Sequence, residues 1–268
     1  MKSSLANQQK RSQVRRYWEL LSVLVERNLK GRYRGSWLGI YWSLLNPLIM
    51  AGIYTAVLGK AFSSYYDDSI FNYILAAFTG LSVFHFFSAA TNQALSSLVA
   101  NGSLINKIKL PLSIFPSSTI AANIFQFAAA NLPPLALMAI LTSGNLVNAL
   151  SLIFPFIALI LFSSGLGYAL SALFVFFRDV PHFYSVMIYA LRIATPVFYP
   201  AEIVPEKVRA FLLLNPLSQI IESFRQITLS GDSPDLSLIG MTLLNSLVVC
   251  FLGWLFFYRY RNQFIDLL

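Results

Sequence analysis

The stretch RNLKGRYRGSWLGIYWSLLNPLIM, residues 27–50, determines the kind of fold to expect from this chain. Its first eight positions hold Arg27, Lys30, Arg32 and Arg34, and no charged residue follows until Lys60. Such a change from basic to apolar sequence is typical of the point where a chain enters a lipid bilayer from the cytoplasm.

The composition of the whole chain agrees with a membrane protein. Of the 268 residues, 57% are hydrophobic and 11% are charged, whereas about 25% of residues are charged in soluble domains. A helix of about 20 apolar residues covers the roughly 30 Å hydrocarbon core. We therefore predict an all-α integral membrane protein with six transmembrane helices, at about 37–61, 71–93, 113–142, 148–177, 183–199 and 236–257.

The distribution of charge predicts the topology of these spans. Basic residues precede Trp37 and recur at alternate span ends: Lys107, Lys109, Arg178, Arg259 and Arg261. Acidic residues concentrate at the opposite ends: Asp67, Asp68, Glu202, Glu206, Asp232 and Asp235. The positive-inside rule then predicts a multi-pass protein of the cytoplasmic (inner) membrane with both termini in the cytoplasm. The net charge of +8 is attributed to the cytoplasmic orientation of the basic segments and to their contact with anionic lipid, and no nucleic-acid partner is expected.

Three segments follow from this topology: a cytoplasmic segment 1–36, a six-span domain 37–260 and a short cytoplasmic tail 261–268. Within the first segment, apolar residues between Val14 and Lys30 repeat at three- and four-residue spacing, which predicts an amphipathic helix in the membrane interface. This helix is either a plain anchor or also a contact for a cytoplasmic partner.

Two cytoplasmic connections carry further patterns. A short helix at about 103–110 is predicted to show Leu104, Ile105 and Ile108 on one side and Lys107 and Lys109 on the other, as an apolar knob in the cytoplasm. The connection FVFFRDVPHFY, 174–184, contains Arg178 and Asp179 where a helix meets water, and they are interpreted as a solvated turn with a local ion pair.

The segment between Thr195 and Pro234 is interrupted by five prolines. Its apolar pieces are too short to cross a bilayer, and we expect two re-entrant or interfacial helices on the outer side, at about 205–214 and 217–229. They form either a folded outer cap or a gate over a pathway.

The spans contain little that could support catalysis. His85 and His182 have no Cys, His or acidic neighbours at metal-ligand spacing, and no phosphate-binding glycine loop is present. Arg192 is the one ionisable residue well inside a span, and such residues usually face a protein interior or a pathway. We therefore predict no catalytic residues, no metal and no cofactor on this chain, so that any ATP and Mg would be bound by another chain.

Aromatic residues make up 15% of the chain. Tyr33, Trp37 and Tyr41 fall four residues apart, which predicts that they share one helical face, and Phe198 and Tyr199 flank the outer proline break. They form either an interfacial belt or the wall of a wide path on which sugar rings stack.

The opening stretch, the LINKIKLP loop, the FFRDV turn and the proline-broken outer segment occur in this order over about Val14 to Tyr260. Together they resemble the transmembrane permeases of ABC-2 type polysaccharide exporters, which export O-antigen, capsule and teichoic acid. Eight residues of the opening stretch match the family's positions: Arg27, Lys30, Arg32, Tyr33, Leu38, Gly39, Trp42 and Pro47.

The resemblance implies a six-span subunit that forms a homodimer and binds two cytoplasmic ATPases. The N-terminal helix and the segment from Leu104 to Lys109 would dock on these ATPases, with Arg178 and Asp179 near the same surface. The first and fifth spans would line the channel, so that Tyr33, Trp37, Tyr41, Phe198 and Tyr199 become candidate glycan contacts. The segments at 205–229 would be outer gate helices.

The expected substrate is a lipid-linked polysaccharide, and Arg32 and Arg34 are the candidate contacts for its diphosphate. In the competing interpretation, the positive charges of these two arginines only set the orientation of the chain in the membrane. The alternatives for function are an exporter of a drug or small lipid, which would be expected to lack the N-terminal helix and the full opening motif, and a membrane-embedded glycosyl- or lipid-transferase, which the shortage of intramembrane acids and histidines disfavours.

Overall fold

The computed structural model describes residues 2–105, 107, 110–205, 207, 212 and 215–267. All regular secondary structure in these ranges is helical, which confirms the all-α prediction. The elements are α1 (Lys2–Tyr33), η1 (Gly39–Tyr41), α2 (Trp42–Phe62), η2 (Ser63–Tyr65), α3 (Ile70–Ala100), α4 (Gly102–Ile105), α5 (Ile114–Ala130), α6 (Leu132–Ser143), α7 (Leu146–Ser151), α8 (Ile153–Phe176), α9 (Val180–Ala194), η3 (Ala201–Ile203), α11 (Pro216–Leu229), α12 (Leu236–Tyr260), η4 (Arg261–Gln263) and α13 (Phe264–Leu267).

Four helical stretches of the described chain are long and apolar enough to cross a membrane: Gly39–Tyr65, Ile70–Ala100, Leu146–Phe176 and Leu236–Gln263. A fifth crossing results if α5 and α6, bent by 42° at their junction, form one span. The fifth of the six predicted spans, 183–199, corresponds to α9, whose 15 residues extend about 22 Å and are shorter than the hydrocarbon core. The structure thus supports four or five crossings, and six remain a prediction.

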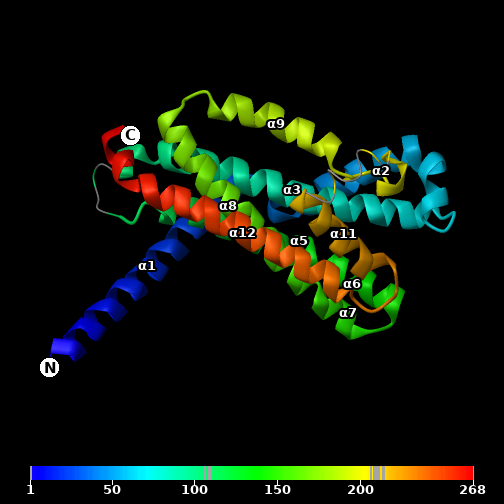
Figure 1. Cartoon of the computed structure of the whole chain (residues 1–268), viewed down its shortest axis with the longest axis horizontal. Coiled ribbons are helices and arrows are strands. Elements are labelled where there is room, and N and C mark those ends of the chain that lie inside the picture. The colour runs from blue at the N-terminus through cyan, green and yellow to red at the C-terminus, as the bar shows by residue number, and fades with distance from the viewer. Residues whose placement is uncertain are drawn as a thin grey trace.

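The bundle is organised around α3, which contacts α2, α5, α8, α9 and α11. Its side chains are buried along most of its length because neighbours cover it on several sides (Figure 1). Phe86 of α3, Phe127 of α5 and Phe156 of α8 meet with ring centroids 5.2–6.2 Å apart. Arrangements of this kind, edge-on or offset, are the favoured ones for aromatic rings.

Helix α1 differs from the predicted N-terminal helix in length. It is continuous over Lys2–Tyr33 rather than limited to about 14–30, and its first half extends away from the bundle (Figure 1). Its second half lies on α5. Leu24 is buried there, with Tyr17, Leu20 and Leu21 packed around the same cluster. Its predicted location in the membrane interface stays a prediction.

The chain does not continue as one helix from α1 into α2. Gly35 and Gly39 both adopt positive φ, at +78° and +50°, a region that glycine enters without the steric cost of a side chain. Tyr33 therefore lies on α1 whereas Trp37 and Tyr41 follow the break, and the expectation that the three share one helical face is wrong.

The short helix after α3 is also smaller than predicted. The structure has α4 at Gly102–Ile105 instead of a helix over about 103–110, because Asn101 caps α3 and starts a new turn with its carbonyl accepting from Leu104 and Ile105. Ile105 is buried in a cluster with Leu24, Leu98 and Phe115. The predicted apolar knob therefore packs against the protein at this position.

The outer segment between α9 and α12 contains one of the two predicted helices. Helix α11 covers Pro216–Leu229, close to the predicted 217–229, and Asn215 starts it by accepting a hydrogen bond from the Leu217 amide. Its apolar face is buried against α3 and α6. Most of the predicted helix at 205–214 falls outside the described residues, and a re-entrant path is not established for either segment.

Candidate functional site

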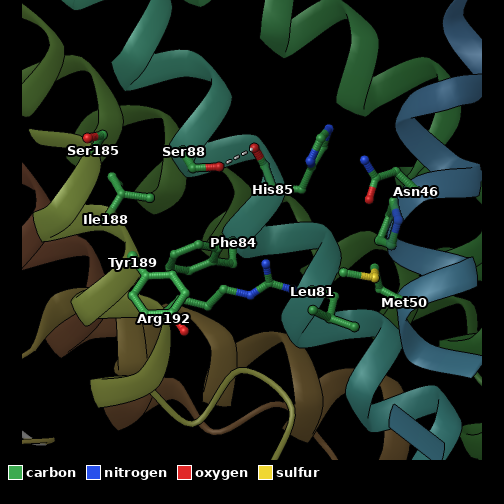
Figure 2. Close-up of a pocket in the computed structure, with 11 residues that line it drawn as sticks. Asn46, Met50, Leu81, Phe84, His85, Ser88, Ser185, Ile188, Tyr189 and Arg192 are labelled. Atoms are coloured by element: carbon green, nitrogen blue, oxygen red, sulfur yellow. Dashed lines mark hydrogen bonds between the residues drawn. The ribbon is translucent and has the colours of Figure 1, made fainter. Parts of the chain in front are cut away.

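A pocket of about 290 Å³ lies between α2, α3 and α9 (Figure 2). Helix α2 contributes Asn46, Pro47 and Met50, helix α3 contributes Leu81, Phe84, His85 and Ser88, and helix α9 contributes Ser185, Ile188, Tyr189 and Arg192. The residues from α9 follow the i, i+3, i+4, i+7 spacing of one helical face. One side of α9 therefore forms a wall of the pocket.

Arg192 is the only charged residue in this lining. Its guanidinium carbon lies 6.0 Å from the centre of the Phe84 ring, within the range of a cation–π interaction. Its Nε is buried and has no hydrogen-bond partner among the described residues. Figure 2 shows its side chain reaching from α9 toward α3, so its unused donor capacity lies where α2, α3 and α9 meet.

The remaining polar groups of the pocket are uncharged. Asn46 and His85 face it from α2 and α3, while Ser88 uses its hydroxyl to donate to the His85 carbonyl at 3.2 Å. Amide, imidazole and hydroxyl groups beside aromatic rings suit the binding of a polar, uncharged ligand such as a sugar. No carboxylate lines the pocket, and the described residues hold no cluster of three or more metal-ligating side chains.

The aromatic residues predicted as glycan contacts do not gather in one place. Trp37 and Tyr41 are 96% and 61% exposed near the start of α2, available to lipid, a second chain or a substrate. Phe198 stacks on Tyr54 with centroids 4.3 Å apart, and the Tyr199 hydroxyl donates to the Ile193 carbonyl at 2.8 Å. Phe198 and Tyr199 thus attach the segment after α9 to α2 and to α9.

Arg32 and Arg34, predicted to bind a diphosphate, have different surroundings. Arg34 is exposed. The Nη1 of Arg32 donates to Asn123 Oδ1 at 3.1 Å and to Gln126 Oε1 at 2.7 Å on α5, and burial lowers the pKa of its guanidinium. Arg32 therefore joins α1 to the bundle, and its other nitrogens remain for any ligand.

The predicted ATPase contacts lie at the basic end of the molecule. Leu104 and Ile105 pack inward, Lys107 is exposed, and Ile108 and Lys109 lie outside the described residues. Arg178 donates to the Leu267 carbonyl at 3.2 Å, and Asp179 immediately precedes α9, where its carbonyl accepts from the amides of His182 and Phe183. None of these contacts tests the predicted docking role.

Sequence reasoning identified Arg192 but missed its companions in the pocket. Ser185 and Tyr189 share its helical face at the spacing given above, which was readable from the sequence. Asn46 and His85 carried no comparable signal because isolated polar residues in a span have many possible environments, and only the packing of α2 and α3 against α9 brings them together.

The described helices form an apolar bundle with a polar-lined pocket between α2, α3 and α9. The chain belongs to the family of ABC-2 type transporters, whose characteristic sequence matches residues 19–229. This match confirms the family resemblance of the sequence motifs.

Relatives within the family carry more specific names. The chain is 29% identical over 255 residues to the O-antigen export system permease protein RfbA of Klebsiella pneumoniae, and the alignment covers 94% of this chain and 95% of the relative. It is 30% identical over 254 residues to the protein of the same name from Myxococcus xanthus, covering 93% and 95%. The polysialic acid transport protein KpsM of Escherichia coli is 24% identical over 255 residues, covering 92% and 96%.

Proposed function

We propose that this chain is the permease subunit of an ATP-driven exporter that moves a lipid-linked, O-antigen-like polysaccharide across the cytoplasmic membrane. The proposal is supported by the near full-length similarity to O-antigen export permeases. The more distant similarity to KpsM makes a capsular polysaccharide the second candidate, with the same mechanism, and teichoic acid is a third polymer of this class.

The observation that carries the proposal is the pocket between α2, α3 and α9. Its lining of amide, hydroxyl, imidazole and aromatic groups provides hydrogen bonds and ring faces without a carboxylate. A sugar polymer offers hydroxyls and apolar ring faces, and it needs weak, repeated contacts in order to keep moving. A lining of this kind favours passage of a glycan over tight binding or chemical change.

A polymer needs a wider path than this pocket, and we propose that two copies of the chain form it. Helices α2 and α9 carry exposed apolar side chains next to the pocket, among them Ile49, Ile53, Val186 and Tyr189. Joining these faces in a homodimer would turn two pockets toward a common channel. Trp37 and Tyr41 would then lie along its entrance, with Phe198 and Tyr199 toward its outer end.

ATP hydrolysis belongs to separate subunits in this proposal. The sequence has no nucleotide-binding loop, so ATP and Mg would be held by two ATPase subunits on the cytoplasmic side, and this chain needs no cofactor. The docking surface would combine α1, the segment 104–109 and the turn at Arg178 and Asp179. Both termini would then be cytoplasmic, and Arg34, assisted by Arg32, would attract the diphosphate of the lipid carrier.

Export in the native host tests the proposal. In cells that lack this chain, lipid-linked polysaccharide should accumulate on the cytoplasmic side, and the native chain should restore surface polysaccharide. Arg192→Gln removes the one charge in the pocket lining and should reduce export of long chains by about tenfold. A tenfold reduction corresponds to a loss of about 1.4 kcal/mol of stabilisation. Arg259→Gln, an exposed change on α12, is the control.

Co-purification with the ATPase encoded nearest to this chain provides the second measurement. A stable complex whose ATP hydrolysis responds to lipid-linked glycan supports the proposal. Hydrolysis stimulated only by small amphiphiles would favour a drug or lipid exporter, and covalent transfer of glycan by the purified chain would replace transport with a transferase activity.

A further inference from the structure

A second cavity, of about 460 Å³, lies between the connection that leads into α5 and the end of α12. The connection contributes Leu110, Pro111, Leu112 and Ser113, and α12 with the turn after it contributes Trp254, Phe257, Tyr258, Arg261 and Asn262. The C-terminal end of α12, which forms one wall of the cavity, lies at the opposite end of the bundle from the loop between α2 and α3 (Figure 1). It shares no residue with the pocket around Arg192.

The polar side chains of this cavity, Arg261, Asn262, Ser113 and Tyr258, can all donate hydrogen bonds. Arg261 makes no ion pair within the described part of the chain, and its guanidinium carbon lies 3.8 Å from the centre of the Tyr258 ring. Ser113 makes no side-chain capping hydrogen bond at the start of α5, and the Asn262 amide belongs to the same lining. No acidic residue lines the cavity. One fixed positive charge with donors beside it suits a phosphate group.

The cavity continues into an apolar surface. Trp254 stacks on Tyr258 with ring centroids 5.1 Å apart, and both are partly exposed, at 44% and 46%. Three neighbouring apolar residues of α12 are also exposed: Phe251, Leu252 and Leu255. Helix α12 is long and apolar enough to span a membrane, and a spanning α12 would place this surface at the depth of acyl chains and the tryptophan–tyrosine pair near its basic end.

We propose that this cavity binds the headgroup of an anionic glycerophospholipid of the inner leaflet. The phosphate contacts Arg261, Asn262 and Ser113, the glycerol region lies against Trp254 and Tyr258, and the acyl chains follow the exposed apolar side of α12. A free phosphate would use the donors but leave the apolar surface uncovered, whereas a zwitterionic lipid would bring a second, positive charge close to Arg261. An anionic lipid matches both halves of the site.

The position of the site suggests what the bound lipid does. Leu110 and Ser113 belong to the connection that follows α4, and Phe257 at the cavity wall is buried with Ile105 in one cluster. A lipid held between this connection and α12 would therefore stabilise the end of the molecule that carries the proposed ATPase-docking segment. This inference rests on the proposed cytoplasmic C-terminus and not on which substrate is exported.

Lipid binding to the purified full-length chain tests the proposal directly. The chain is stripped of lipid in detergent, titrated with dioleoylphosphatidylglycerol or dioleoylphosphatidylcholine, and analysed by native mass spectrometry. We expect at least one phosphatidylglycerol to bind about fivefold more tightly than phosphatidylcholine, as one favourable basic contact of about 1 kcal/mol predicts. Equal affinities for the two lipids would overturn the proposal.

Matched variants locate the bound lipid. Arg261→Gln should abolish the preference for phosphatidylglycerol, whereas Arg259→Gln should retain it, because Arg259 lies two residues away on α12 and does not line the cavity. Trp254→Leu should weaken both lipids while keeping the ratio between them. If Arg259→Gln has the same effect as Arg261→Gln, the preference reflects general surface charge and the assigned site is wrong.

Competition distinguishes the source of the phosphate. Neither inorganic phosphate nor glycerol 3-phosphate at millimolar concentration should displace the bound phosphatidylglycerol, since both lack acyl chains. Displacement by either would show a phosphate site without a lipid component, and the proposal would be rejected in favour of a soluble anion.

Discussion

Arg225 is the most deeply buried charged side chain of the described chain, at 5% exposure. Its Nε donates to the Ala76 carbonyl on α3 at 3.1 Å, and its Nη2 donates to the Val197 carbonyl at 2.8 Å. The Val197 carbonyl follows the end of α9, and Gly80 of α3 approaches it closely, since a Cβ at Gly80 would overlap that oxygen. Arg225 thus fixes α11 to α3 and to the segment after α9.

Replacing Arg225 with methionine should lower the stability of the protein. The change removes two hydrogen bonds and leaves the buried Val197 carbonyl without its Arg225 donor, at a cost of about 1–3 kcal/mol. We expect a lower midpoint of thermal unfolding in detergent, followed by size-exclusion chromatography. Arg259→Met, at an exposed position, serves as the control, and an unchanged midpoint for Arg225→Met would show that this clamp does not contribute to stability.

At the scale of elements, α8 and α12 are joined by a close crossing of two glycines. A Cβ atom at Gly253 would overlap the backbone of Gly165, and one at Gly165 would lie 2.7 Å from the Cα of Cys250. Small residues permit this approach of helix backbones in membrane proteins, where packing replaces the hydrophobic driving force. The two glycines are therefore structural requirements of this helix pair.

Gly253→Ala should disrupt this crossing. The added methyl group requires α8 and α12 to move apart, and overpacking of this kind costs about 1–3 kcal/mol. Gly240→Ala is the matched control on the same helix, because a Cβ there would have no neighbour within 4 Å. Thermal unfolding of the two variants should separate them clearly. A midpoint for Gly253→Ala that equals that of Gly240→Ala would contradict the close crossing.

The attachment of α1 to α5 depends on one face of α1. Leu24 is 7% exposed while the adjacent Val23 is 61% exposed. Asn28 donates to the Ser118 hydroxyl at 3.1 Å, next to the Arg32 contacts already described. The polar bonds and the apolar contact lie on the same side of the helix, so they should be lost together.

Leu24→Asp should release α1 from the bundle, whereas Val23→Asp should not. A carboxylate at position 24 would be buried without a partner, which costs several kcal/mol, while at position 23 it would stay solvated. Limited trypsin digestion measures the difference, because release exposes the bonds after Arg27 and Lys30. Equal cleavage rates for the two variants would mean that this contact does not hold α1.

For the whole molecule, the sequence predicted the elements that apolar length alone determines. Runs of about 20 apolar residues predict helices that are buried in lipid or protein. The structure has such helices at α3, α8, α12 and the broken pair α5–α6. The break at Gly35 and Gly39, the inward packing of Ile105 and the grouping of His85 with Arg192 depend on backbone conformation or on contacts between distant segments. Such features carry no periodic signal, and the sequence could not have revealed them.

The number of membrane crossings depends on whether α9 spans the membrane, and labelling of single cysteines measures this. Cys250 is the only cysteine, so Cys250→Ala provides a background for single cysteines at Asp67, Asn145, Asp179, Asp232 and Asn262. With six crossings and cytoplasmic termini, positions 67, 145 and 232 should react with an impermeant maleimide in intact cells, or in spheroplasts if an outer membrane is present. Positions 179 and 262 should react only after the membrane is permeabilised.

Positions 232 and 262 decide whether α9, with the extended segment after it, crosses the membrane. Asp179 lies before α9, and α12 separates Asp232 from Asn262. If α9 and the segment after it return to the side where they began, position 232 becomes protected and position 262 becomes reactive from outside, while positions 67, 145 and 179 are unchanged. That result would leave five crossings, would put the C-terminus on the outer side, and would exclude a lipid of the inner leaflet at Arg261.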